Sequence, residues 1–231
     1  MSRPDPLDIV LVGGGLANGL IAWRLSQSRP ELRLAVVEAG PHVGGNHPWS
    51  FHEGDLTAAE HGWIAPFVSY RWEDNEVQFP NRRKRLGTGY CSISSERFRS
   101  LLEARLGDRI RCNTPVGAVA PKSVVLTDGT TIEAGCVIDG RGHAPSRHMR
   151  LGFQKFLGQE IEMAEPHGVG RPVIMDATVP QSDGYRFVYL LPLTATRLLV
   201  EATYYADGEV LDRERLAASI RQYMTDHGWR A

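Results

Sequence analysis

The sequence predicts an α/β protein with two parts, an N-terminal domain of strands and helices and a second, mostly β-sheet domain. The first observation is the segment LDIVLVGGGLANGLIAWRLSQS, which is an apolar strand, a glycine turn and a helix. LRLAVVEAG adds a second strand and completes a βαβ unit of about 30 residues. The second observation is a run of strand-like segments after Arg150, over 173–177, 185–191 and 197–205, before a helix over 212–226. The third is that 231 residues are enough for one large domain or two smaller ones, and that 42% hydrophobic content can supply an extended core.

The first domain is predicted to cover residues 1–150 and to contain an aromatic insertion at about 41–85. Glycine, histidine, tryptophan and proline residues break the strand–helix pattern in this insertion. Its predicted elements are short, with a helix near 57–61 and strands at 68–71 and 76–79.

The rest of the first domain returns to regular patterns. SSERFRSLLEARLG predicts a helix that a serine caps and Gly107 ends. AVAPKSVVLTDGTTIEAGCVIDGRG predicts two strands around an Asp-Gly turn and a further apolar strand that ends in glycines. Residues 151–231 are predicted to form the second, mostly β-sheet domain.

Three consecutive glycines stand between the first strand and the first helix. Gly13, Gly14 and Gly15 allow a tight turn and a close approach of a pyrophosphate to the helix N-terminus, where Leu16 and Ala17 begin the helix. Glu38 ends the second strand about 20 residues later, where an acid accepts hydrogen bonds from ribose hydroxyls. Strand, turn, helix, strand and acid in this order predict a Rossmann-type dinucleotide site.

The glycine fingerprint alone does not separate NAD from FAD, and Asn18 replaces its third glycine. Two later features favour FAD: the helix at 96–106 after a long insertion, and the strand end VIDGRG, which contains Asp139, Gly140 and Arg141. In flavoproteins built like the aromatic hydroxylases, a similar strand returns beside the cofactor. An ordinary turn at DGRG is the alternative interpretation.

Composition argues against several other classes. The 26 basic and 27 acidic residues give a net charge of -1, so no overall field attracts nucleic acid. The three cysteines and the scattered histidines lack metal-ligand spacing, so no metal site is expected. We expect a cytoplasmic protein, soluble or peripherally bound to a membrane. The basic run NRRKR at 81–85 is interpreted as a solvated face, with contact to phosphate or membrane head groups as the alternative.

Glu201 interrupts the apolar strand LLVEATYY. Alternation places it on the opposite face from Leu198 and Val200, which belong to the core face. If the preceding turn centres on Thr194, Phe187 and Tyr189 on the neighbouring strand flank the carboxyl. Desolvation by these aromatic residues would raise the pKa of the carboxyl. A one-residue slip removes this setting, so a half-solvated sheet carboxylate is the interpretation that the pattern alone favours.

The assembled segments resemble those of the flavin-dependent lycopene β-cyclases of bacteria. The matching stretches are GGGLANGLIAWRL, GGNHPWSFH, VIDGRG, GFQKFLGQE and PVIMDATVPQSDGYRFVYLLPLTATRLLVEATYY, which together span almost the whole chain. The resemblance implies a redox-neutral isomerisation of lycopene ψ ends to β-ionone rings, giving γ-carotene and β-carotene. It implies reduced FAD, NAD(P)H as the external reductant, and peripheral contact with the inner face of the bacterial cytoplasmic membrane.

The resemblance also assigns a role to Glu201, because the family's acid or base is a glutamate in a strand motif similar to LIEDT. Ala202 stands where that motif has a second acid. Members of the family continue well beyond residue 231, so the chain is interpreted as C-terminally truncated, with residues 151–231 as an incomplete substrate domain. It is expected to bind FAD poorly and to show little activity. A FAD-dependent monooxygenase, an isoprenoid reductase and an inactive flavoprotein fragment are the alternatives. The ring type, β or ε, and cyclisation at one or both ends stay open.

Overall fold

The computed structural model describes residues 7–142, 147–182 and 184–230. The chain divides into two compact units. The first contains residues 1–50, 57–69 and 92–145, and the second contains residues 51–56, 70–91 and 146–231. The division near residue 146 lies close to the boundary predicted at 150. The insertion predicted at 41–85 does not lie wholly within the first unit, because residues 51–56 and 70–91 belong to the second unit.

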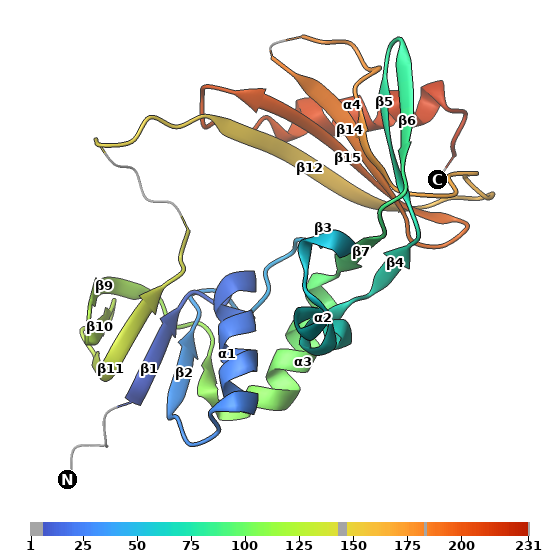
Figure 1. Cartoon of the computed structure of the whole chain (residues 1–231). Coiled ribbons are helices and arrows are strands. Elements are labelled where there is room, and N and C mark those ends of the chain that lie inside the picture. The colour runs from blue at the N-terminus through green and yellow to red at the C-terminus, as the bar shows by residue number, and fades with distance from the viewer. Residues whose placement is uncertain (1–6, 143–146, 183, 231) are drawn as a thin grey trace. The chain divides into compact units, whose positions relative to one another are not determined.

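The first unit is built on the expected βαβ segment, β1 (Leu7–Val12), α1 (Leu16–Ser28) and β2 (Leu34–Val37). Its six-stranded sheet has the order β8-β2-β1-β11-β10-β9, in which β8, β2, β1 and β11 are parallel (Figure 1). Strands β1 and β2 are almost wholly apolar because their faces are largely buried, as expected for parallel strands. The remaining strands are β8 (Ile110–Arg111), β9 (Val116–Ala120), β10 (Ser123–Leu126) and β11 (Thr131–Asp139).

One nine-residue strand, β11, replaces the two strands predicted after the Asp-Gly turn. Its first part pairs antiparallel with β10, and its second part, from Ala134, pairs parallel with β1. The apparent break in the pattern is Gly135, whose hypothetical Cβ would lie 3.0 Å from the carbonyl oxygen of Asp8. A glycine at this position therefore reflects close backbone approach between strands rather than a chain break.

Two helices of the first unit pack closely against each other. The Ser94 hydroxyl caps α3 (Ser95–Leu106) by accepting from the Arg97 N–H. Gly19 of α1 is the contact point, since a Cβ there would lie 2.4 Å from Phe98 of α3. The short α2 (Ala58–Ile64) begins after the capping residue Thr57. Short 3₁₀ helices occur at Glu53–Asp55, Ala65–Phe67 and Gly107–Arg109.

The second unit is a six-stranded sheet of order β12-β15-β14-β13-β5-β6, with α4 (Arg213–Asp226) packed on one face (Figure 1). The core on that face includes Leu198, Val200 and Ala202 of the sheet and Leu216 and Ile220 of the helix. The strands are β5 (Asn75–Phe79), β6 (Arg82–Leu86), β12 (Phe153–Glu162), β13 (Val173–Asp176), β14 (Arg186–Pro192) and β15 (Arg197–Ala206).

Two of these strands were not expected from the sequence. Strand β12 lies at the sheet edge, and although Leu157 and Ile161 pack against the core, polar residues share their face, so its alternation is weak. Strand β6 is the basic run RRKRL, and it pairs with β5 at the other edge of the sheet. Pairing of β5 with β13 is what draws this part of the insertion into the second unit.

A separate three-stranded sheet has the order β3-β7-β4, formed by β3 (Trp49–His52), β7 (Tyr90–Ile93) and β4 (Tyr70–Trp72). Within the described residues, none of the helices combines the length and apolar character that crossing a bilayer requires.

Candidate functional site

A cavity of about 350 Å³ opens in the first unit, where the parallel strands β1, β2 and β11 end. In open α/β sheets, ligands bind at the carboxyl ends of the strands. Of the nine residues predicted to bind a cofactor, five line this cavity, namely Gly13, Gly15, Glu38, Gly140 and Arg141. Its other lining residues are Val12, Val37, Ala39, Thr114 and Val116.

The glycine turn brings two distant segments together. Gly13 has a φ of +92°, and a Cβ on it would lie 2.9 Å from the carbonyl oxygen of Gly140. The Gly140 N–H donates to the carbonyl of Val12 at 2.8 Å, which ties the end of β11 to the end of β1. By contrast, a Cβ on Gly15 would meet no atom within 4 Å. Gly15 also precedes α1, whose first turn has no acidic residue and no side-chain cap, so this helix N-terminus can accept an anion.

Glu38 lies on the opposite side of the same turn. Its two carboxylate oxygens accept hydrogen bonds from the backbone N–H groups of Gly14 (2.6 Å) and Gly40 (2.7 Å). These bonds fix the carboxylate at the cavity wall. The same oxygens are suited to accept from ribose hydroxyl groups.

Asn18, which replaces the third glycine of the fingerprint, has a defined structural role. Its side-chain amide donates to the carbonyl groups of Val12 and Gly13, each at 2.9 Å, and the residue is buried. Gly19, one position later, packs against Phe98 of α3, whereas the third glycine of the fingerprint serves packing of the helix on the strand. The departure from the fingerprint thus adds a clamp on the turn.

The remaining four predicted cofactor residues lie next to the cavity rather than on its wall. Gly14 contacts Glu38 through its N–H, and Leu16 and Ala17 form the first turn of α1. Asp139 ends β11 and binds Arg141 through both carboxylate oxygens, at 2.8 and 2.7 Å. The hydrogen bonds from Arg141 lower the pKa of Asp139. The same bonds hold the Arg141 side chain in position.

Glu201 lies on β15 in the second unit, on the face opposite α4. Tyr189 of β14 is its direct cross-strand neighbour, and Phe187 pairs with the next residue on the same face, Thr203. The register assumed from a turn near Thr194 is therefore the one observed. On the other side, Gly158 of β12 pairs with Glu201, and a Cβ on Gly158 would lie 3.3 Å from its Oε2 atom.

The surroundings of Glu201 favour its neutral form. Burial raises the pKa of its carboxyl group, and the hydrogen bond that the Thr203 hydroxyl donates to Oε1 at 3.1 Å opposes this effect only in part. No basic residue contributes to the shift. The geometry thus provides a partly buried carboxyl that can carry a proton nearer neutral pH than an ordinary glutamate.

Next to Glu201, the same face of the sheet is apolar and aromatic. Leu191 and Leu199 pack with Tyr90, and Trp72 and Tyr189 border this cluster. The Tyr90 and Tyr189 hydroxyls lie 3.1 Å apart. The aromatic residues of the insertion do not form one surface, because Trp72 joins this cluster whereas Trp49 packs on Phe98 in the first unit.

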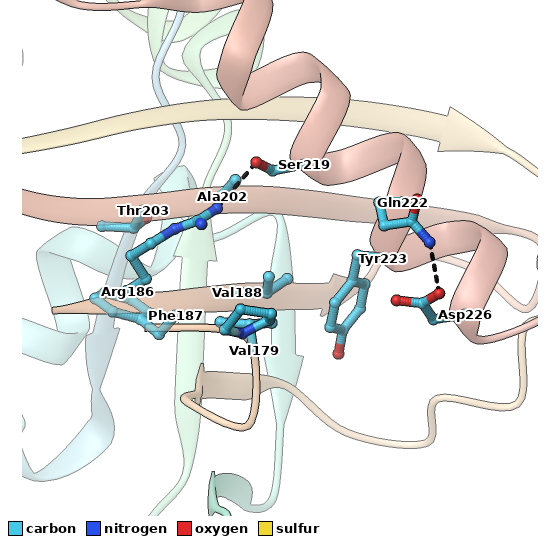
Figure 2. Close-up of a pocket in the computed structure, with 11 residues that line it drawn as sticks. Val179, Arg186, Phe187, Val188, Ala202, Thr203, Ser219, Gln222, Tyr223 and Asp226 are labelled. Carbon is cyan, nitrogen blue, oxygen red and sulfur yellow. Dashed lines mark hydrogen bonds between the residues drawn. The ribbon is translucent and has the colours of Figure 1, made fainter. Parts of the chain in front are cut away.

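Ala202, the departure from the family motif, points to the other face, into the core beneath α4. It lines a small cavity of about 150 Å³ between the sheet and that helix (Figure 2). Arg186 crosses this region and donates to the Ser219 hydroxyl at 2.9 Å (Figure 2). An acid at position 202 would therefore not share the face of Glu201.

Sequence reasoning did not identify several site residues. Thr114 and Val116 line the first cavity although they follow a two-residue strand with no recognisable motif. Gly158 lies in the unpredicted strand β12, and only its glycine identity within that strand signals a close approach.

Comparison with known proteins gives a consistent result for the fold. A 2-methyl-3-hydroxypyridine-5-carboxylic acid oxygenase has a TM-score of 0.65 at 14% identity. The match covers 96% of this chain and 66% of the oxygenase chain. A geranylgeranyl bacteriochlorophyll reductase-like protein from Thermoplasma acidophilum also has a TM-score of 0.65, at 13% identity, over 96% of this chain and 62% of its own. The fold is thus the Rossmann-type α/β fold expected from the sequence, followed by a second part rich in β-sheet.

Sequence comparison is more specific. A lycopene beta-cyclase from Pseudescherichia vulneris is 52% identical over 222 residues, and one from Pantoea ananas is 50% identical over 222 residues. Each match covers 96% of this chain but only 58% of the relative, so the chain spans little more than half the length of these curated proteins. The family model described as lycopene cyclase protein matches residues 8–231. The chain therefore belongs to the lycopene cyclase family.

Proposed function

We propose that this chain carries the dinucleotide site and the catalytic acid of a lycopene β-cyclase, which converts ψ ends of lycopene into β-ionone rings. The observation that carries the proposal is Glu201, a partly buried carboxyl with a raised pKa beside an aromatic strand, in a member of this family. The products are γ-carotene and β-carotene. The reaction is an isomerisation, since no atom is gained or lost.

In the proposed reaction, the neutral carboxyl of Glu201 donates its proton to C2 of the ψ end and becomes a carboxylate. The C5–C6 double bond then attacks the cationic C1, and loss of the C6 proton leaves the ring double bond. A carboxyl can start this sequence only if its site keeps it protonated, which desolvation favours. The ring of Tyr189, the cross-strand neighbour of Glu201, would offer its electron-rich face to the carbocation.

The cavity of the first unit fits the proposed cofactor FAD. Gly15 leaves room for a pyrophosphate at the start of α1, Glu38 would accept from the ribose, and Gly13, Gly140 and Arg141 border the same cavity. When bound and reduced, a flavin supplies an electron-rich group that stabilises cationic species. NAD(P)H is proposed as the external reductant that keeps it reduced.

The substrate is a hydrocarbon that resides in membranes, so we infer peripheral attachment to the inner face of the bacterial cytoplasmic membrane. The buried cluster around Tyr90 and Leu199 makes the Glu201 face apolar beside the carboxyl, which suits a hydrocarbon substrate.

The role of Glu201 is tested by Glu201→Gln in a lycopene-accumulating bacterial host. Because this chain spans 58% of its relatives, the host carries a chimera in which the unmatched C-terminal part of the Pseudescherichia vulneris relative follows residue 231. We expect the substitution to slow cyclisation by at least about 100-fold, the usual contribution of a general acid. Carotenoid extracts are analysed by chromatography.

Glu160→Gln is the matched control, because Glu160 is an exposed acid on the same sheet face, on the neighbouring strand. It should cyclise at the rate of the unmodified chimera. Full activity of Glu201→Gln would exclude the proposed role. Stoichiometric consumption of NAD(P)H per product would instead indicate a hydroxylase or an isoprenoid reductase.

A further inference from the structure

The basic run Arg82–Leu86 forms a β-hairpin with Asn75–Phe79 at the edge of the second sheet. The hairpin is antiparallel, and Phe79 pairs with Arg82 and Val77 pairs with Lys84. Because side chains alternate along a strand, the four basic residues separate into two pairs on opposite faces.

On one face of the hairpin, the basic residues are bound by buried acids. Arg83 forms an ion pair with Glu76, and Arg85 forms one with Asp74. Arg171 contributes a further contact to Asp74, at 2.6 Å. These interactions hold the hairpin in place and engage the two basic residues of this face in ion pairs.

This ion-paired face lies on the same side of the sheet as α4. Gln78, which hydrogen-bonds Glu76, pairs with Asp176 of β13. The Asp176 carboxylate accepts a hydrogen bond of 2.6 Å from the hydroxyl of Tyr223 on α4. Arg82 and Lys84 therefore point away from α4.

The opposite face of the hairpin carries Val77, Phe79, Arg82 and Lys84, which we call the basic hairpin face. Phe79 is 39% exposed, and Arg82 and Lys84 are exposed. The other two strand residues on this face, Asn75 and Leu86, are also not acidic. The result is a small surface on which two cations stand beside an exposed aromatic ring.

We propose that the basic hairpin face binds a bilayer surface with anionic phosphate head groups. This inference rests on the proposed function, whose substrate resides in membranes, and it names the element that makes the contact. Exposed aromatic residues with neighbouring Lys or Arg suit the interface between head groups and acyl chains. A nucleic-acid site is less suited, because such sites neutralise many phosphates and this face offers two cations.

The test is cosedimentation of the chain with vesicles of phosphatidylglycerol and phosphatidylcholine, or of phosphatidylcholine alone, without any carotenoid. Each basic residue near an anionic surface strengthens binding by about fivefold, so Arg82→Gln with Lys84→Gln should weaken binding about 25-fold. Phe79→Ser should weaken it further, and Arg82→Lys with Lys84→Arg should restore it. The matched control is Arg213→Gln with Arg221→Gln, which removes two exposed cations from α4 on the other face.

The proposal predicts tight binding to the anionic vesicles only, unchanged binding of the control and release by salt. It is overturned if the chain ignores anionic vesicles, if it binds phosphatidylcholine equally, or if the control loses as much affinity as the hairpin variant. Binding of an RNA or DNA oligonucleotide with higher affinity than the vesicles would also overturn it. Vesicle binding by a chimera that leaves lycopene acyclic would contradict only the proposed function.

Discussion

At the scale of single residues, the strand around Glu201 contributes core residues on one face and the candidate acid on the other. Its neighbours Val200 and Ala202 are buried against α4, whereas Glu201 itself faces Tyr189 and Gly158 on the adjacent strands. A side chain at Gly158 would crowd the carboxyl at 3.3 Å, so a glycine leaves that side open. The carboxyl is thus partly removed from water without being tied to a basic partner.

The raised pKa of Glu201 predicts a pH-dependent stability. Between its usual value of 4.5 and its higher folded-state value, the native state binds more protons than the unfolded state. The contribution of Glu201 to stability is therefore full below pH 4.5 and is lost as the pH rises through the folded-state pKa. Glu201→Gln lacks this loss, so its free energy of unfolding should increase relative to wild type over this window and then level off.

Urea unfolding at a series of pH values measures this difference, which cancels the contributions of the other acids. Glu160→Gln again serves as the control and should follow the wild type, because Glu160 is exposed. A difference for Glu201→Gln that is flat, or that falls as the pH rises, would show that burial does not raise this pKa.

At the scale of elements, helix α1 combines a ligand-facing end with a packed side. Gly15 at its start has open space around it, whereas Gly19 lies against Phe98 and Leu102 of α3. Two glycines four residues apart are thus needed for different reasons. The first leaves room at the cavity, and the second permits two helices to approach.

Alanine should therefore have different effects at these two positions, on stability at Gly19 and on FAD binding at Gly15. Gly19→Ala places a Cβ within 2.4 Å of Phe98 and should lower the free energy of unfolding by about 1–3 kcal/mol through overpacking. Gly15→Ala should leave stability within about 0.5 kcal/mol, as is usual away from packed contacts, and should weaken FAD binding. Urea unfolding and flavin fluorescence titration measure the two effects; equal loss of stability in both variants would refute this assignment.

Elements were predictable where their signals are local. The βαβ unit, the Ser94 cap of α3 and strands β14 and β15 all follow from patterns within short windows. Strands β12 and β6 were missed because edge strands carry weak alternation or many charges. The two strands predicted after the Asp-Gly turn are one strand, β11, in which Gly135 permits close approach to the backbone of Asp8.

At the scale of the whole molecule, the chain contains a candidate dinucleotide site and a candidate acid, but it spans only 58% of the length of its curated relatives. We expect the chain alone to bind FAD weakly and to leave lycopene acyclic. The chimera that continues after residue 231 should bind FAD at least about tenfold more tightly, which corresponds to about 1.4 kcal/mol, and should produce β-carotene. Flavin titration and carotenoid chromatography of both proteins measure this; equal affinity and equal cyclisation would show that the chain is sufficient.

The sequence by itself determined the glycine turn, its acidic partner Glu38 and the face on which Glu201 lies. These features depend on residues within about 30 positions of one another, where helix and strand periods are informative. Only the tertiary structure decided that Gly140 approaches Gly13, that Gly158 lies beside Glu201, and that the hairpin of the insertion extends the second sheet. Each of these contacts depends on hydrogen bonding and packing between segments distant in the chain, which no local periodicity specifies.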